Sequence, residues 1–140
     1  MVPSNPCQWR LAVQRAHWGM IKNMSTALLL EDEPLIAMDM EENLHVAGFE
    51  VVHLMSCAAA NNWIDANKAD VAIVDIQLTD GSCHEVVERL RFTGVPFVVH
   101  SGDVANQHAG TSFEHGIWVN KPSSENELIA AVRQAMTRAN

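Results

Sequence analysis

Five side chains of this sequence carry groups that could do chemistry, and each follows or ends a short apolar run. They are Glu31, Asp32, Asp75, Ser101 and Lys121. Carboxylates gather hard cations such as Mg²⁺, and a carboxylate can also attack phosphorus as a nucleophile. An ammonium and a hydroxyl can stabilise the charge of a transferring phosphoryl group. If the fold brings these groups together, they indicate metal-assisted phosphoryl transfer.

The apolar runs before these groups predict buried strands. Residues 71–74 are Val-Ala-Ile-Val, a continuous apolar run rich in β-branched side chains, and Asp80-Gly81 follow as a turn. Such a run is typical of a strand buried on both faces. We predict the other strands, in chain order, at 27–30, 49–54, 95–100 and 117–119.

Predicted helices alternate with these strands, which favours parallel pairing through right-handed crossovers. Residues 101–115 show little periodicity, so we expect the fourth helix to be short or missing. The predicted fold is α/β, a flavodoxin-like doubly wound five-stranded parallel sheet of order 2-1-3-4-5 with helices on both faces. In that order the first and third strands are neighbours, so Glu31, Asp32 and Asp75 should meet at one edge.

Side-chain spacing also predicts how the helices start and pack. Pro34 suits the first turn of the first helix, and Gly48 should end that helix. Ser56 can cap the second helix. Two pairs have the spacing of a capping box, Ser82 with Glu85 and Ser124 with Glu127. The apolar stripe of the first helix is predicted at Leu35, Ile36, Met38, Leu44 and Val46.

Composition limits the class of protein. The chain has 140 residues, 48% hydrophobic and 19% charged, which suits one globular domain. No apolar run approaches the ~20 residues of a membrane-spanning helix. The three cysteines, Cys7, Cys57 and Cys83, have no C-x-x-C spacing, so we expect free, mostly structural thiols in a reducing, cytoplasmic location.

Charge divides the chain into two parts. Residues 1–23 hold three basic residues and no acid, whereas the rest holds six basic and 17 acidic residues, a formal charge of −11. The acidic part argues against nucleic-acid binding, which needs a basic face. We expect residues 1–23 to be an N-terminal extension, disordered or not native to the functional chain, and residues 24–140 to form the domain.

The pattern of polar residues at the strand ends resembles the receiver domain of two-component response regulators. The matching residues are Glu31-Asp32, Asp75, Ser101 and Lys121-Pro122, and the resemblance covers about residues 25–139. It implies that Asp75 accepts a phosphoryl group from the phosphohistidine of a sensor kinase. It also implies Mg²⁺ bound by Asp32, Asp75 and the backbone carbonyl of Gln77, with Glu31 acting through water.

The resemblance assigns roles to three further side chains. Ser101 would interact with the new phosphoryl oxygens, Lys121 would pair with one of them, and Trp118 would be the family's switch aromatic. Residues 96–102 resemble, less closely, a subgroup of stand-alone receivers with Ala-Thr-Gly in this strand. Here His100 replaces the alanine, Ser101 replaces the threonine and Asp103 lies close by, which bears on how strongly the domain switches. Ser123 stands where an aromatic residue often follows Lys-Pro.

These features favour a single-domain response regulator, which is not an enzyme with turnover. Its partners would be a sensor histidine kinase or phosphotransfer protein and a downstream protein target, with no nucleic acid or membrane. Two alternatives stay open. One is a pseudo-receiver that binds partners without phosphorylation. The other is a phosphatase with an aspartyl nucleophile, which Gln77 disfavours because such enzymes commonly carry a second Asp there.

Overall fold

The computed structural model describes residues 24–139, so the prediction for residues 1–23 lies outside the described residues. Five parallel strands form the sheet in the order β2-β1-β3-β6-β7. The strands are β1 (Thr26–Leu30), β2 (Glu50–Leu54), β3 (Val71–Val74), β6 (Phe97–Ser101) and β7 (Ile117–Asn120). This is the order predicted from the sequence, and the α/β fold class is confirmed.

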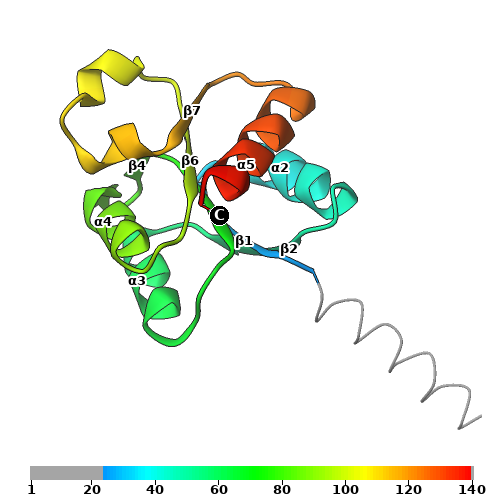
Figure 1. Ribbon diagram of the computed structural model, residues 1–140, viewed down its shortest axis with the longest axis horizontal. Helices are drawn as coiled ribbons and strands as arrows, with labels where there is room; N and C mark the ends of the chain where they lie inside the picture. The colour runs from blue at the N-terminus through cyan, green and yellow to red at the C-terminus, as the bar shows by residue number, and fades with distance from the viewer. Residues whose placement is uncertain (1–23, 140) are drawn as a thin grey trace, which may run out of the picture.

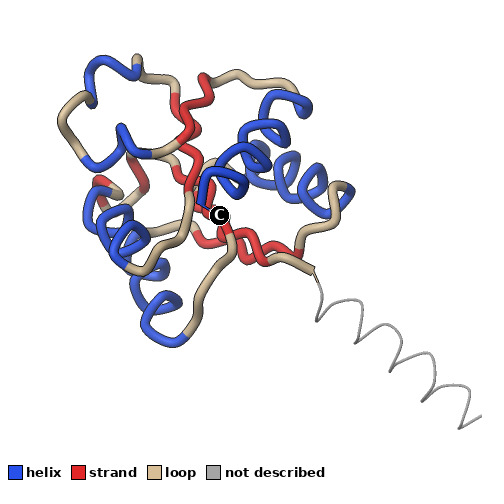
Figure 2. Tube along the Cα trace, in the orientation of Figure 1, coloured by secondary structure: helices blue, strands red, loops and turns tan. Residues whose placement is uncertain are grey.

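Within the described residues, four α-helices cover the two faces of this sheet (Figures 1 and 2). They are α2 (Pro34–Val46), α3 (Cys57–Ala66), α4 (His84–Phe92) and α5 (Glu125–Ala139). Helices α2 and α5 lie together on one face, whereas α3 and α4 lie together on the other. Where a fourth crossover helix would run, the chain makes two 3₁₀ turns, η1 (Ala105–His108) and η2 (Ser112–His115).

Alternate residues of the central strands fill two separate cores. In β1, Leu28 and Leu30 pack with the α3 and α4 side, whereas Ala27 and Leu29 pack with the α2 and α5 side. All four are buried, as are all four residues of β3. A strand buried on both faces reads as a continuous apolar run because neither face meets water.

A short antiparallel hairpin follows β3 and was not anticipated from the sequence. It consists of β4 (Gln77–Leu78) and β5 (Gly81–Ser82). Gly81 has a φ of +128°, a conformation that suits glycine because it has no Cβ. The hairpin carries the chain from the end of β3 to the start of α4.

The predicted apolar stripe of α2 was partly wrong. Leu35, Met38 and Val46 are exposed at 76%, 66% and 77%. The buried residues of this helix are Ala37, Met40 and Leu44. Spacings of three and four residues place these three on a single face, and only one face of a helix can contact the sheet. Apolar residues on the other sides therefore stay in solvent.

The two predicted capping boxes had different outcomes. Ser124 Oγ accepts a hydrogen bond from the backbone N–H of Glu127 and donates one to its carboxylate, so that start was predicted correctly. The box at Ser82 was wrong, because α4 begins one residue later with Cys83 at the cap position. Ser82 belongs to β5, where it pairs with Gln77.

Candidate functional site

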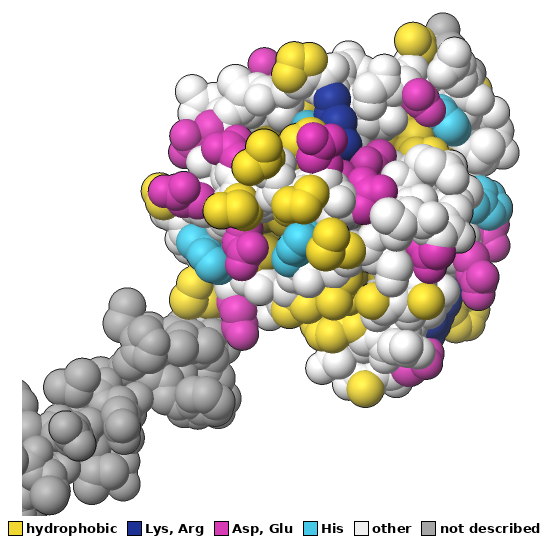
Figure 3. Space-filling model, turned by 180° about the vertical axis from the view of Figure 1, so that it is seen from behind, with side chains coloured by type: hydrophobic (Ala, Val, Ile, Leu, Met, Phe, Trp, Pro, Cys, Tyr) yellow, Lys and Arg dark blue, Asp and Glu magenta, His cyan; other side chains and the backbone are white. Residues whose placement is uncertain are grey.

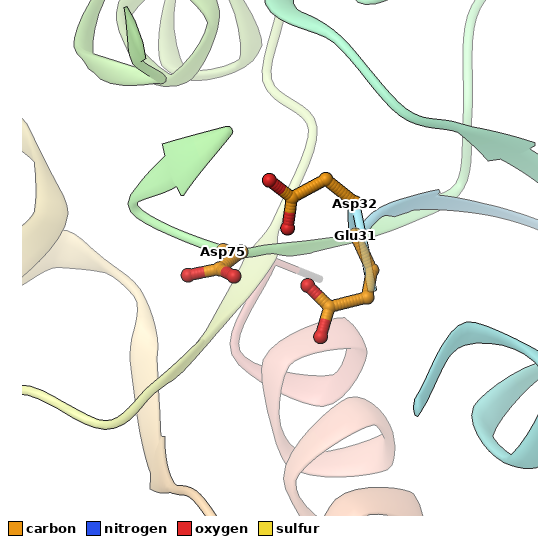
Figure 4. A group of neighbouring side chains, drawn as sticks. All are labelled: Glu31, Asp32 and Asp75. Atoms are coloured by element: carbon orange, nitrogen blue, oxygen red, sulfur yellow. The ribbon is translucent and has the colours of Figure 1, made fainter. Parts of the chain in front are cut away.

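Three carboxylates converge at the carboxyl ends of β1 and β3. Glu31 and Asp32 follow β1, and Asp75 follows β3. These strands pair directly, and the backbone N–H of Asp75 extends the pairing by donating to the Leu30 carbonyl at 3.0 Å. Carboxylate oxygens of the three residues lie within 4.8 Å of one another. Figure 4 shows the three side chains around one common space.

Lys121 reaches this space from the end of β7. Its Nζ donates to Glu31 Oε1 at 2.8 Å and to Asp75 Oδ2 at 2.9 Å. Its backbone N–H donates to the carbonyl of Ser101 at 2.9 Å, which fixes the start of the loop after β7. The fold therefore brings together four residues that lie up to 90 positions apart in sequence.

Burial shapes the electrostatics of the site. Glu31 is 1% exposed, and burial, with Asp75 nearby and against the opposing effect of Lys121, raises its pKa to about 7. Burial alone would lower the pKa of Lys121, but its hydrogen bonds to Glu31 and Asp75 outweigh that effect and raise it. Lys121 therefore stays charged, and Glu31 binds a proton more readily than an ordinary carboxylate.

The donor set fits a hard divalent cation. Three carboxylates face a single ammonium, so two negative charges are left uncompensated when all three are ionised. Glu31 Oε2 is buried and is the one side-chain N or O atom of the described residues that is buried without a hydrogen-bond partner. A buried polar atom without a partner is costly, and a cation or a bound water would satisfy it. Gln77 starts β4 two residues after Asp75, with its side chain exposed.

Ser101 lies at the end of β6 with its hydroxyl engaged outside the carboxylate cluster. The residue is 3% exposed, and Oγ accepts a hydrogen bond from the backbone N–H of Asp103 at 3.0 Å. Asp103 Oδ2 in turn lies 3.1 Å from Nε2 of His108. The hydroxyl is thus tied to the segment that contains the two 3₁₀ turns.

Trp118 in β7 is partly buried and contacts the same segment. Its ring stacks on that of His108, with centroids 5.6 Å apart and an interplanar angle of 27°. Its indole N–H donates to Asn120 Oδ1 at 3.0 Å. Ser101, Asp103, His108 and Trp118 therefore form a continuous series of contacts. Sequence reasoning missed His108, because its contact depends on the path of an irregular segment.

His100 and Ser123, two departures from the family pattern, contact each other. Nε2 of His100 lies 2.9 Å from Ser123 Oγ, and His100 is 5% exposed. Burial and the nearby Lys121 lower the pKa of His100 to about 4, so the ring is neutral at neutral pH. The pair links the end of β6 to the loop after Lys121. One signal was available, since alternation in β6 points His100 toward the α5 side, where this loop lies.

Known proteins share this fold and sequence pattern. Residues 27–133 match the family model of the response regulator receiver domain. The transcriptional regulatory protein KdpE of Mycobacterium tuberculosis is 30% identical over 118 residues, which cover 82% of this chain and 52% of that protein. The chain thus spans about half the length of this curated relative.

Solved structures of receiver domains have the same fold as this chain. A response regulator receiver protein from Sinorhizobium medicae superposes with a TM-score of 0.78 and 28% identity, covering 84% of this chain and 98% of that chain. The receiver domain of the Pseudomonas aeruginosa sensor histidine kinase PA1611, solved with a magnesium ion in its active-site cleft, gives a TM-score of 0.71 at 18% identity, covering 81% and 98%. The chain belongs to the response regulator receiver domain family.

Proposed function

We propose that Asp75 accepts a phosphoryl group from a phosphohistidine of a sensor histidine kinase or a phosphotransfer protein, in a reaction that depends on Mg²⁺. The observation that carries the proposal is the convergence of Asp75 with Glu31, Asp32 and Lys121. Family membership supports it. Acidic and basic groups this close are typical of sites that bind and transfer phosphate.

The transfer is a displacement at phosphorus. A carboxylate oxygen of Asp75 forms the new O–P bond while the N–P bond of the phosphohistidine breaks. The bonding pair of the N–P bond returns to that ring nitrogen. Because the other ring nitrogen carries a proton, the leaving group is a neutral imidazole. Lys121 already lies 2.9 Å from Asp75 Oδ2, so its ammonium is placed to pair with an oxygen of the incoming group.

The metal would be held by Asp32, Asp75 and the backbone carbonyl of Gln77, with Glu31 acting through a water molecule. Bound Mg²⁺ would neutralise charge that develops on the phosphoryl oxygens. The buried, unpartnered Oε2 of Glu31 supports this assignment, because it offers an acceptor to such a water. The PA1611 receiver domain was solved with magnesium in its active-site cleft, which also favours Mg²⁺ here.

Phosphorylation would change the surface around the 3₁₀ turns. A new phosphoryl group on Asp75 would attract the Ser101 hydroxyl, which now accepts from Asp103. Loss of that bond would loosen Asp103 and His108, and through the stack would free Trp118 to change its position. A local charge change would in this way bias a two-state surface. In this proposal Trp118 is the switch residue.

The output would be protein docking or a phosphorelay, in the cytoplasm, without turnover of a substrate. Among the charged side chains of the described residues, 17 are acidic and six are basic, and Figure 3 shows one face with numerous acidic and few basic side chains. Such a surface disfavours DNA. Among the described residues, no helix has both the length and the apolar character needed to cross a membrane.

A metal-dependence experiment tests the proposal. The chain is incubated with an acyl phosphate, with Mg²⁺ or with a chelator, and the phosphorylated fraction is measured by intact mass. We expect modification only with Mg²⁺, and at least about tenfold less in Asp32→Ala. Glu33→Ala is the matched control, because Glu33 is the exposed neighbour outside the cluster. Equal modification of both variants would overturn the metal assignment, and a folded chain that takes up no phosphoryl group would favour the pseudo-receiver.

A further inference from the structure

Two thiols lie in contact where the helices α3 and α4 begin. Cys57 is the first residue of α3, and Cys83 immediately precedes α4. Their Sγ atoms are 3.4 Å apart. Cys83 is buried and Cys57 is half-buried. Neither takes part in the phosphoryl chemistry described above.

Hydrogen bonds hold both cysteines in place. The carboxylate of Asp80 accepts from the backbone N–H groups of Cys57 and Ala58, at 2.7 and 2.9 Å, and so fixes the start of α3 against the β4–β5 hairpin. The backbone N–H of Cys83 donates to the Ile76 carbonyl at 2.8 Å. The two sulfur atoms are therefore brought together by the fold, and the contact does not depend on flexible side chains alone.

We propose that Cys57 and Cys83 form a reversible disulfide when a hydroperoxide oxidises the chain. The inference is independent of phosphoryl transfer and goes beyond it. Cys57 is the first to react because it is the more accessible of the two. The held geometry then favours capture by Cys83 over further oxidation, since a positioned partner acts at a high effective concentration.

The atoms balance in two steps. The Cys57 sulfur attacks the peroxide, the O–O bond breaks, and the product is a sulfenic acid with release of an alcohol, or of water from hydrogen peroxide. The Cys83 sulfur then attacks the Cys57 sulfur. The S–S bond forms, the S–O bond breaks, and the hydroxyl leaves with the thiol proton as water. In total, two thiols are oxidised and one peroxide is reduced.

Burial gives this reaction a distinct pH dependence. Burial raises the pKa of Cys57 and that of Cys83, each thiol with some contribution from the neighbouring charges. The thiolate is the nucleophile in both steps, so a raised pKa slows oxidation near neutral pH. The rate should therefore keep increasing as the pH rises beyond the range in which an ordinary thiol is already ionised.

The bridge would tie α3 to the loop that carries the acceptor. Residues 75–83 include Asp75, the β4–β5 hairpin and Cys83. A bond between Cys83 and Cys57 would close a loop of the unfolded chain and should raise the midpoint of thermal unfolding. It would also restrict movement of the segment that contains Gln77.

Intact mass and peptide mapping test the proposal. The chain carrying Cys7→Ser, in which only this pair of thiols is left, is treated with hydrogen peroxide, and residual thiols are then alkylated. We expect the loss of two hydrogens, a cross-linked peptide containing Cys57 and Cys83, and reversal by a dithiol reductant. A chain that stays reduced, or that accumulates oxygen adducts without a bridge, would overturn the proposal. No phosphodonor is present, so the result does not depend on the acceptor site.

Two comparisons test whether the fold itself brings the two thiols together. In denaturant a smaller share of the oxidised chain should end as the bridge and a larger share as oxygen adducts, because the fold no longer positions the sulfur atoms. Asp80→Ala, which removes the acceptor at the start of α3, should also lower the bridged share in the folded chain. Equal bridged shares in folded and denatured chains would contradict the proposal.

Discussion

At the scale of single residues, Glu31 sets the response of the site to pH. It is buried beside Asp75 and Lys121, and burial raises its pKa to about 7. A protonated carboxyl carries no negative charge to attract a cation, so the affinity of the site for Mg²⁺ should fall as the pH falls through about 7. Glu31→Gln should bind Mg²⁺ less tightly and lose this pH dependence. Calorimetric titration measures both, and an unchanged pH profile in the variant would count against the role of Glu31.

His100 gives a second pH-dependent prediction, from a pKa that the fold lowers instead of raising. Burial lowers its pKa to about 4, whereas in the unfolded chain it would titrate near 6.5. Between these values the unfolded state binds the extra proton, so the free energy of unfolding should fall as the pH falls through this window. His100→Gln should remove roughly 2–3 kcal/mol of that fall.

Urea unfolding at the two ends of the window measures the effect of His100. Ser123→Ala serves as the partner variant, because Ser123 Oγ lies 2.9 Å from the ring. A double-mutant cycle should give a coupling of about 1 kcal/mol. If the wild type and His100→Gln show the same acid sensitivity, the ring is not held neutral by the fold.

At the scale of elements, the segment with η1 and η2 should respond to phosphorylation. Asp103 and His108 connect it to Ser101 and Trp118. Modification of Asp75 should speed amide exchange across residues 101–115, because the bond from the Asp103 N–H to Ser101 Oγ is lost. Exchange mass spectrometry measures this, with α3 as an internal reference. Unchanged exchange in this segment would show that the switch lies elsewhere.

The element boundaries show what local sequence can predict. The strands were identified because each contains an apolar run, and the start of α5 because Ser124 and Glu127 interact with each other as their spacing requires. The same spacing failed at Ser82 because the chain uses that residue in a hairpin. The predicted apolar stripe of α2 was partly wrong because several sides of this helix carry apolar residues, and only packing decides which side meets the sheet.

At the scale of the whole molecule, the described residues form a five-stranded sheet with a core on each of its faces. We therefore expect a chain of residues 24–140 to fold without residues 1–23. Its thermal unfolding midpoint should match that of the full chain, because the sheet and the two cores formed by the described residues stay intact. Circular dichroism on both chains measures this. A truncated chain that unfolds at a clearly lower temperature would show that residues 1–23 contribute to the fold.

The site could be anticipated at this scale because parallel strands end at the same edge. The order of strands makes Glu31 and Asp75 neighbours, whereas Lys121 follows β7, which β6 separates from β3, and reaches both carboxylates through its long side chain. The pairs His100 with Ser123 and Cys57 with Cys83 were not predicted. They depend on where loops and helix starts return to the sheet, and sequence spacing does not determine that.

The central claim is that Asp75 is the phosphoacceptor. Its most direct test is intact mass after incubation with an acyl phosphate and Mg²⁺, for the native chain and for Asp75→Asn. The control is Asp39→Asn, because Asp39 is an exposed carboxylate of α2. We predict one added phosphoryl group in the native chain and in the control, and none in Asp75→Asn. Retention of the adduct in a folded Asp75→Asn chain would contradict the assignment.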